Sequence, residues 1–202
     1  MREVVTRLYT FAELSDKAKA KVLDKFRYTN VEAFEWYDLA YEEWKESLRE
    51  KMGIDGAEIR FSGFYSQGDG ASFTGQIDEE WIKKFVRERK DRFPALAADF
   101  DLDDPKVEIA EAQVTRGSGM HVHEHTCRVS LDLRVPVGFP EDETDRLESD
   151  LEEIRLDLSR EIYRDLEREH DYLTGDEAII ETIEANDYEF DEAGNFPPHS
   201  AT

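Results

Sequence analysis

The sequence predicts an α+β fold in which helices pack on an antiparallel sheet of about four to six strands. Apolar residues recur at helical spacing in some segments and alternate with polar residues in others. Glycine-rich turns separate the alternating segments in pairs, which is typical of hairpins. Because no repeat or linker divides the chain, we expect a single domain over residues 1–193 and a flexible tail over residues 194–202.

The first half of the chain is expected to alternate between helices and strands. Ser15 stands at a helix N-cap position, and Ala18 and Val22 then fall on one helix face. Gly53 follows a stretch with aromatic and aliphatic residues at helical spacing, which is the usual position of a glycine that ends a helix. The expected elements are a strand at 2–9, helices at 16–27 and 33–51, strands at 57–65 and 71–77, and a helix at 79–90.

The second half is expected to contain two long strands and then mostly helix. Pro94 and the acid-rich stretch 99–105 predict a loop. The turn at 116–119 separates the two strands, and leucines and isoleucines over 141–171 form one helical stripe. The expected elements are strands at 106–115 and 120–135, helices at 141–171 and 175–185, and a strand at 188–190.

The chain is strongly acidic, with a formal net charge of −23. Since phosphates repel such a surface, we expect no direct binding to nucleic acid. Residues 141–192 hold 22 Asp and Glu against 5 Arg and no Lys, whereas the rest of the chain holds 27 acids against 21 bases. This asymmetry predicts one acidic face rather than acid spread over the whole surface.

Several features predict an intracellular protein. No apolar run approaches the roughly 20 residues that a membrane-spanning helix needs, so we expect no membrane association. The N-terminal segment lacks the apolar core of a signal peptide. Cys127 is the single cysteine and cannot form an intrachain disulfide, which fits a reducing compartment.

The first segment with functional potential runs from Phe61 to Phe73 and combines glycines, small hydroxyls and aromatic residues around a turn. Glycines let backbone N–H groups face a ligand, although no phosphate-motif lysine is present. The alternative is a tight turn in which Gly68 and Gly70 adopt positive φ and Asp69 caps the turn. The predicted ligand-binding residues of this segment are Phe64, Tyr65, Ser66, Gln67, Asp69 and Ser72.

The second segment is the histidine-rich run from His121 to Cys127. If it is a strand, alternate residues share one face, so His121, His123 and His125 extend the apolar face of the following residues. We predict that these three histidines bind a ligand at the rim of a pocket. The alternatives are a transition-metal site formed by the same imidazoles and a purely structural strand end.

The third segment is the acidic helix over 141–171, whose acid–Arg pairs at i,i+3 spacing include Glu152–Arg155, Asp157–Arg160, Glu161–Arg164 and Asp165–Arg168. Such pairs each stabilise an exposed helix slightly. The helix is therefore interpreted either as a solvated face or as a surface that docks a basic partner.

The blocks Phe11–Lys19, Phe61–Phe73 and His123–Thr126, with Tyr188–Phe190 and Gly194 near the end, resemble a group of uncharacterised proteins of tailed bacteriophages. Some of these carry an antitoxin-like label. The resemblance implies a phage or prophage source and a role inside the infected cell. It supplies no catalytic residues.

We therefore expect a non-enzymatic phage accessory protein in the host cytoplasm with a role in counter-defence. In one version, the Phe61–Phe73 and His121–Cys127 segments bind a small nucleotide-like ligand. In the other, the acidic helix binds a basic host protein. The alternative from another class is a metal-dependent hydrolase that uses His121, His123 and His125. We expect no cofactor for the binding protein, whereas the hydrolase would need a divalent transition metal. The sequence does not decide the oligomeric state.

Overall fold

The computed structural model describes residues 7–32, 36–119 and 121–197. The chain divides into two compact units. The terminal unit consists of Met1–Asp38 and Glu167–Thr202, and the sheet unit consists of Leu39–Leu166. Helix α5 (Glu141–Leu173) runs through both units, and the expectation of a single domain stays a prediction. Across these described ranges, no helix is both long enough and apolar enough to cross a bilayer.

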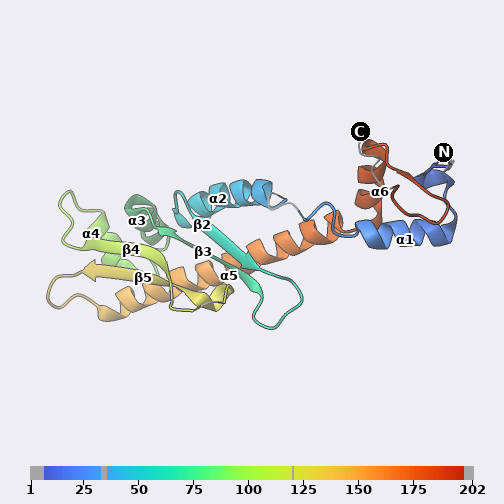
Figure 1. Cartoon of the computed structure of the whole chain (residues 1–202). Helices are drawn as coiled ribbons and strands as arrows, with labels where there is room; N and C mark the ends of the chain where they lie inside the picture. Colours follow the sequence, from blue (N-terminus) through green and yellow to red (C-terminus); the bar gives the residue numbers. More distant parts are fainter. Residues whose placement is uncertain (1–6, 33–35, 120, 198–202) are drawn as a thin grey trace. The chain divides into compact units, whose positions relative to one another are not determined.

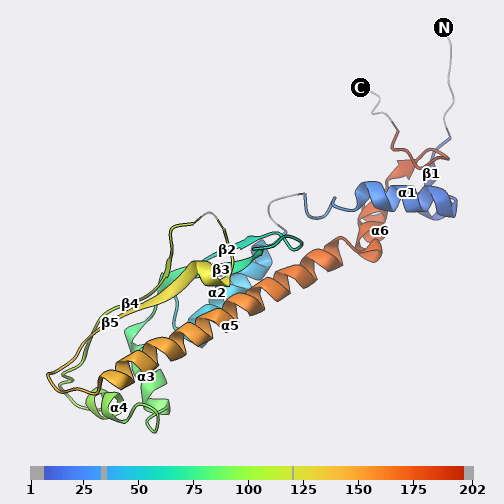
Figure 2. The same cartoon turned by 90° about the horizontal axis from the view of Figure 1, so that it is seen from below.

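The sheet unit is built on an antiparallel sheet with the strand order β2-β3-β4-β5 (Figure 1). Figure 2 shows the N-terminal part of α5 running alongside β4 and β5. Together with the small sheet of the terminal unit, this arrangement confirms the predicted α+β class. The elements are α2 (Asp38–Met52), β2 (Glu58–Ser62), β3 (Gly70–Gln76), α3 (Glu79–Glu88), α4 (Pro94–Phe100), β4 (Glu108–Arg116), η2 (Glu124–Thr126) and β5 (Cys127–Arg134).

The core of the sheet unit lies between the sheet and its helices. The apolar stripe predicted for α5 is buried at all but one of its positions, since Ile154 is only half-buried. Burying such side chains is the main favourable contribution to folding. The fully buried members of this core include Leu48, Met52, Ile54, Phe73, Ile82, Leu147, Leu151 and Ile162.

The terminal unit packs α1 (Asp16–Phe26) against α6 (Asp176–Ala185), with a small sheet of β1 (Tyr9–Thr10) and β6 (Glu189–Phe190). The 3₁₀ helix η1 (Phe11–Glu13) follows β1. The expected tail overlaps this packing at residues 194–197, and residues 198–202 lie outside the described part of the chain. The buried core consists of Phe11, Leu14, Ala18, Val22, Ile179, Ile183 and Phe190.

Both predicted helix boundaries agree with the local chemistry. The Ser15 hydroxyl accepts a hydrogen bond from the N–H of Ala18 at 3.4 Å and so caps α1. Gly53 has φ +69°, and its N–H donates to the carbonyl of Arg49, which ends α2 in the left-handed conformation that glycine allows.

Three predicted elements differ from the structure. Of the strand expected at 2–9, the structure shows only the short strand β1, which begins at Tyr9. Residues 2–6 lie outside the described part of the chain. The loop expected around Pro94 is wrong, because Pro94 opens the short helix α4. The strand expected at 120–135 begins only at Cys127, and a 3₁₀ helix occupies Glu124–Thr126.

Helix α4 depends on a residue that is distant in the sequence. The Glu143 side chain is 3% exposed, and its carboxylate accepts hydrogen bonds of 3.0 Å from the N–H groups of Ala95 and Leu96. An N-terminal proline fits the first turn of a helix, and a carboxylate there satisfies N–H groups that the helix itself leaves unpaired. The cap therefore joins α4 to the first turn of α5.

We expect Glu143→Ala to lower the free energy of unfolding by about 1–3 kcal/mol, because it leaves buried N–H groups unpaired. Denaturation in urea measures the change. The matched control is Glu148→Ala, which removes an exposed carboxylate from the same helix and should change stability by less than about 0.5 kcal/mol. Equal losses in the two variants contradict the capping role.

Candidate functional site

The loop between β2 and β3, residues 63–69, is closed by hydrogen bonds of its own and is called the hairpin loop. The Asp69 carboxylate accepts hydrogen bonds from the N–H groups of Tyr65 and Ser66 at 3.0 and 2.7 Å. Gly68 has φ +92°, which favours glycine. Asp69 is predicted to bind a ligand, but one of its carboxylate oxygens accepts both of these hydrogen bonds from the loop itself. The side chains of Tyr65, Ser66 and Gln67 are exposed around it.

Residues 121–126, called the histidine segment, turn rather than extend. His123 Nδ1 accepts a hydrogen bond from the N–H of His125 at 3.2 Å, and the Thr126 hydroxyl donates to the carbonyl of His123 at 2.7 Å. These bonds close the 3₁₀ turn η2. The expected alignment of His121, His123, His125 and Cys127 on one strand face is therefore wrong, because alternation begins only at Cys127.

The histidine segment lies against the hairpin loop and the ends of β2 and β3 beside it, although about 50 residues separate the two segments. The Ser62 hydroxyl donates to the carbonyl of Val122 at 2.9 Å. A Cβ atom on Gly70 would lie 2.7 Å from the Cβ of His123, so only glycine allows this approach. Gly68 lies close to His121, since its Cβ position is 3.8 Å from Nδ1 of that ring.

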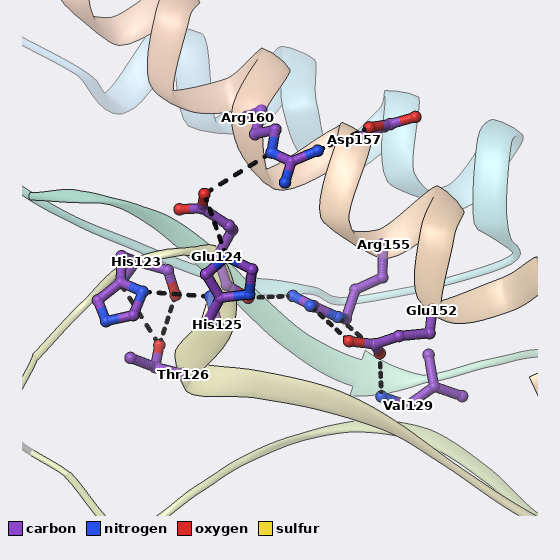
Figure 3. A network of polar contacts seen from close by, with 9 residues as sticks. All are labelled: His123, Glu124, His125, Thr126, Val129, Glu152, Arg155, Asp157 and Arg160. Carbon is purple, nitrogen blue, oxygen red and sulfur yellow. Dashed lines mark hydrogen bonds and ion pairs between the residues drawn. The ribbon is translucent and has the colours of Figure 1, made fainter. Parts of the chain in front are cut away.

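Helix α5 supports the histidine segment from behind through Arg155, which is fully buried (Figure 3). Arg155 Nη1 donates to the carbonyl of Glu124 at 2.6 Å. Its Nε and Nη2 donate to the two carboxylate oxygens of Glu152 at 2.9 and 2.7 Å. Glu152 in turn accepts a hydrogen bond from the N–H of Val129 at 2.8 Å. One ion pair therefore holds both η2 and the start of β5.

The pKa of Glu152 is lowered from its ordinary value of 4.5. Partial burial acts in the opposite direction and raises it, but the hydrogen bonds from Arg155 and from the Val129 N–H, with the positive charge of Arg155, outweigh burial. Glu152 is therefore a carboxylate at neutral pH and keeps Arg155 paired.

The side of the histidine segment that faces α5 also carries a looser ion-pair network. Arg160 Nε lies 3.6 Å from the Glu124 carboxylate, and His125 Nε2 lies 3.7 Å from it. Arg160 also pairs with Asp157 at 3.2 Å. Figure 3 shows these groups on the α5 side of η2. The single acid of the histidine segment is thus surrounded by basic groups.

The predicted site residues fall into two sets. Phe64 packs with its ring 5.6 Å from Phe61 and 5.5 Å from Tyr163, and Ser72 is buried in β3, so both have structural surroundings. His123 and Asp69 are held by the local bonds described above. The exposed members, which a ligand can reach, are Tyr65, Ser66, Gln67, His121 and His125.

The positions of His121, His123 and His125 do not form a metal centre. In the described part of the chain, no three His, Cys, Asp or Glu side chains gather closely enough to hold a metal ion. His123 is further constrained because its Nδ1 accepts a hydrogen bond, which leaves the proton of the neutral ring on Nε2. The hydrolase alternative therefore gains no support from these residues.

Sequence reasoning missed the role of Arg155. Its pair with Glu152 was expected on an exposed helix face, yet the guanidinium is fully buried. A signal was present, because Arg155 lies four residues after Leu151 and three before Leu158, within the apolar stripe. A charged residue in such a stripe indicates a buried partner.

A family model described as "Domain of unknown function (DUF8835)" matches residues 36–176. The match covers more than half of the chain, so the chain belongs to this family. No curated protein and no solved structure matches it. The matched region contains the whole sheet unit, including the hairpin loop and the histidine segment.

We expect Gly70→Ala to destabilise the protein by about 1–3 kcal/mol, because the added methyl group collides with His123. Thermal unfolding measures the loss. Gly119→Ala is the matched control, since an added Cβ there meets nothing within 4 Å. If both substitutions leave the melting temperature unchanged, the close approach of the two segments is wrong.

The Glu152–Arg155 pair also predicts a pH dependence of stability. The pKa of Glu152 in the folded protein lies below its ordinary value of 4.5. The contribution of the Glu152 carboxylate to stability is therefore complete above pH 4.5 and is lost as the pH falls through the folded-state pKa. We expect Glu152→Gln to reduce the free energy of unfolding at neutral pH, and the deficit relative to wild type should shrink below pH 4.5. Glu153→Gln, on the exposed face, should show no such pH-dependent deficit.

Proposed function

We propose that the protein is a non-enzymatic binding protein whose ligand is a small anionic, nucleotide-like molecule. The proposed site is the surface shared by the hairpin loop and the histidine segment. The observation that carries the proposal is a local depletion of acid. Residues 61–73 and residues 113–130 each contain one acidic residue, whereas 49 of the 202 residues in the chain are acidic.

Both remaining acids at this surface are already engaged. Asp69 accepts from the backbone of its own loop, and Glu124 lies beside Arg160 and His125. Anions are repelled by most of a chain with net charge −23, so a surface with few carboxylates is where one can approach.

The exposed side chains supply the groups that such a ligand needs. His121 and His125 offer imidazole N–H donors, and Ser66 and Gln67 offer a hydroxyl and an amide. Tyr65 is 79% exposed and presents a ring on which a planar base can stack. Hydrogen bonds within the hairpin loop and from the buried Arg155 position the backbone of this surface, and such preorganisation lowers the entropic cost of binding.

The resemblance to proteins of tailed bacteriophages supports a role inside an infected cell. There, a protein that captures a nucleotide signal removes it from host enzymes and blunts the defence that depends on it. Binding alone is sufficient for this role, and none of the residues in the proposed site needs to be catalytic.

The test is ligand-induced thermal stabilisation with nucleoside phosphates, cyclic dinucleotides and inorganic phosphate as probes. At a concentration of about 100 times Kd, a ligand that binds only the folded state adds about 2.7 kcal/mol of stability. We expect one nucleotide class to stabilise the wild-type protein, and His121→Ala and Gln67→Ala to lose most of that gain. Both side chains are exposed, so their melting temperatures without ligand should stay near that of wild type.

Arg134→Ala, an exposed change at the far end of β5, is the matched control and should keep the full stabilisation. Stabilisation by inorganic phosphate alone would show that the site recognises the anion and not the base. If no probe stabilises the protein, or if the two site variants respond like wild type, the proposal is wrong.

A further inference from the structure

The last strand of the sheet, β5, has one paired side and one open side. It pairs with β4 and stands at the end of the strand order. We propose that the open edge of β5, at Leu131 and Leu133, binds an extended basic peptide of a partner protein, which adds a strand to the sheet. This inference is independent of the ligand site proposed above.

The direction of the backbone groups follows from two hydrogen bonds. The N–H of Val129 donates to Glu152 of α5 and not to β4. The carbonyl of Ala112, the β4 residue opposite Leu131, accepts from the N–H of Ile77, on the side of β4 away from β5. Because antiparallel residue pairs alternate, the N–H and C=O groups of Leu131 point away from β4, like those of Val129. Leu133 follows by the alternation within β5 itself, since the register shift lies on β4 between Ile109 and Glu111.

A groove runs along this edge. It has a volume of about 180 Å³ and lies between β5 and the first turns of α5. Three consecutive residues of β5 line it, so it follows the strand for about 7 Å at a rise of about 3.4 Å per residue. Its lining residues are Leu131, Asp132, Leu133, Thr144, Asp145 and Glu148.

The charge of the groove selects the partner. Asp132, Asp145 and Glu148 contribute carboxylates, and no cation lines the groove. No ion pair joins any of these three carboxylates to another residue within the described ranges. Repulsion among them is relieved by a peptide that brings Lys or Arg, and an acidic peptide is repelled.

Glu152 fixes the register of the proposed peptide. It occupies the edge N–H of Val129 as a neighbouring strand would, so pairing begins beyond Val129, at Leu131. The peptide then exchanges hydrogen bonds with Leu131 and Leu133, and specificity comes from side chains that alternate between the leucines and the acids. The shortness of the free stretch and its flanking charges limit pairing with other edges.

The probe is a short synthetic peptide of alternating Lys and Val, and the same peptide with Glu in place of Lys is its control. We expect the Lys peptide to bind, to weaken as salt is added, and to protect the amides of Leu131 and Leu133 from hydrogen exchange. The Glu peptide should not bind. If the Lys peptide does not bind at about 1 mM, or binds without protecting these amides, the inference is overturned.

Two sets of variants locate the contact. Asp145→Lys with Glu148→Lys should weaken binding by roughly tenfold or more, whereas Glu153→Lys, on the same helix but outside the groove, should change it little. Leu131→Pro removes an edge N–H that β4 does not use, so the ladder between β4 and β5 stays intact while binding is lost. Unchanged binding in either groove variant overturns the inference.

A modified peptide covers the case in which Leu131→Pro fails to fold. N-methylation of the peptide at alternate residues blocks hydrogen bonding on one side of its backbone. Methylation in one of the two alternating phases should abolish binding to the wild-type protein, and methylation in the other should preserve it. Equal effects in the two phases contradict strand addition.

Discussion

The ion pair between the buried Arg155 and the half-buried Glu152 is the interaction on which the arrangement of the sheet unit around the candidate site depends. Arg155 is fully buried, and each of its hydrogen bonds goes to a group that must stay in place. Removing Glu152 would leave the guanidinium of Arg155 buried without its carboxylate partner, which is unfavourable. The pair is therefore a strong constraint on conformation, and it joins α5 to both η2 and β5.

This constraint explains how the two candidate segments meet. The Glu124 carbonyl, held by Arg155, keeps the chain turned at η2, and the turn brings His123 against Gly70 of β3. Each segment is closed by its own local bonds, the hairpin loop through Asp69 and the histidine segment through His123, whereas Arg155 fixes where η2 lies. Together they form the one surface of the sheet unit that we propose for an anionic ligand, because their acids are few and already engaged.

The acidic residues of α5 have different structural surroundings, which the sequence does not distinguish. Along α5, Glu143 caps α4 and Glu152 holds β5, so both carboxylates have structural roles. Others, such as Asp145 and Glu148, line the open edge of β5. The acidic helix is thus neither uniformly solvated nor uniformly a docking surface. Its inward carboxylates position backbone N–H groups, and some of its outward ones line the groove that we propose for a basic peptide.

The sequence by itself determined the α+β class, the N-cap at Ser15, the end of α2 at Gly53 and the apolar stripe of α5, because each depends on residues a few positions apart. It also identified Tyr65, Gln67, His121 and the other exposed residues as candidates. Only the tertiary structure decided that η2 turns, that α4 exists and that Arg155 is buried. Those features depend on hydrogen bonds such as Glu143 to Ala95 and Arg155 to Glu124, whose partners lie tens of residues apart. The spacing of apolar residues along the sequence does not predict such contacts, since they form only when distant elements pack together.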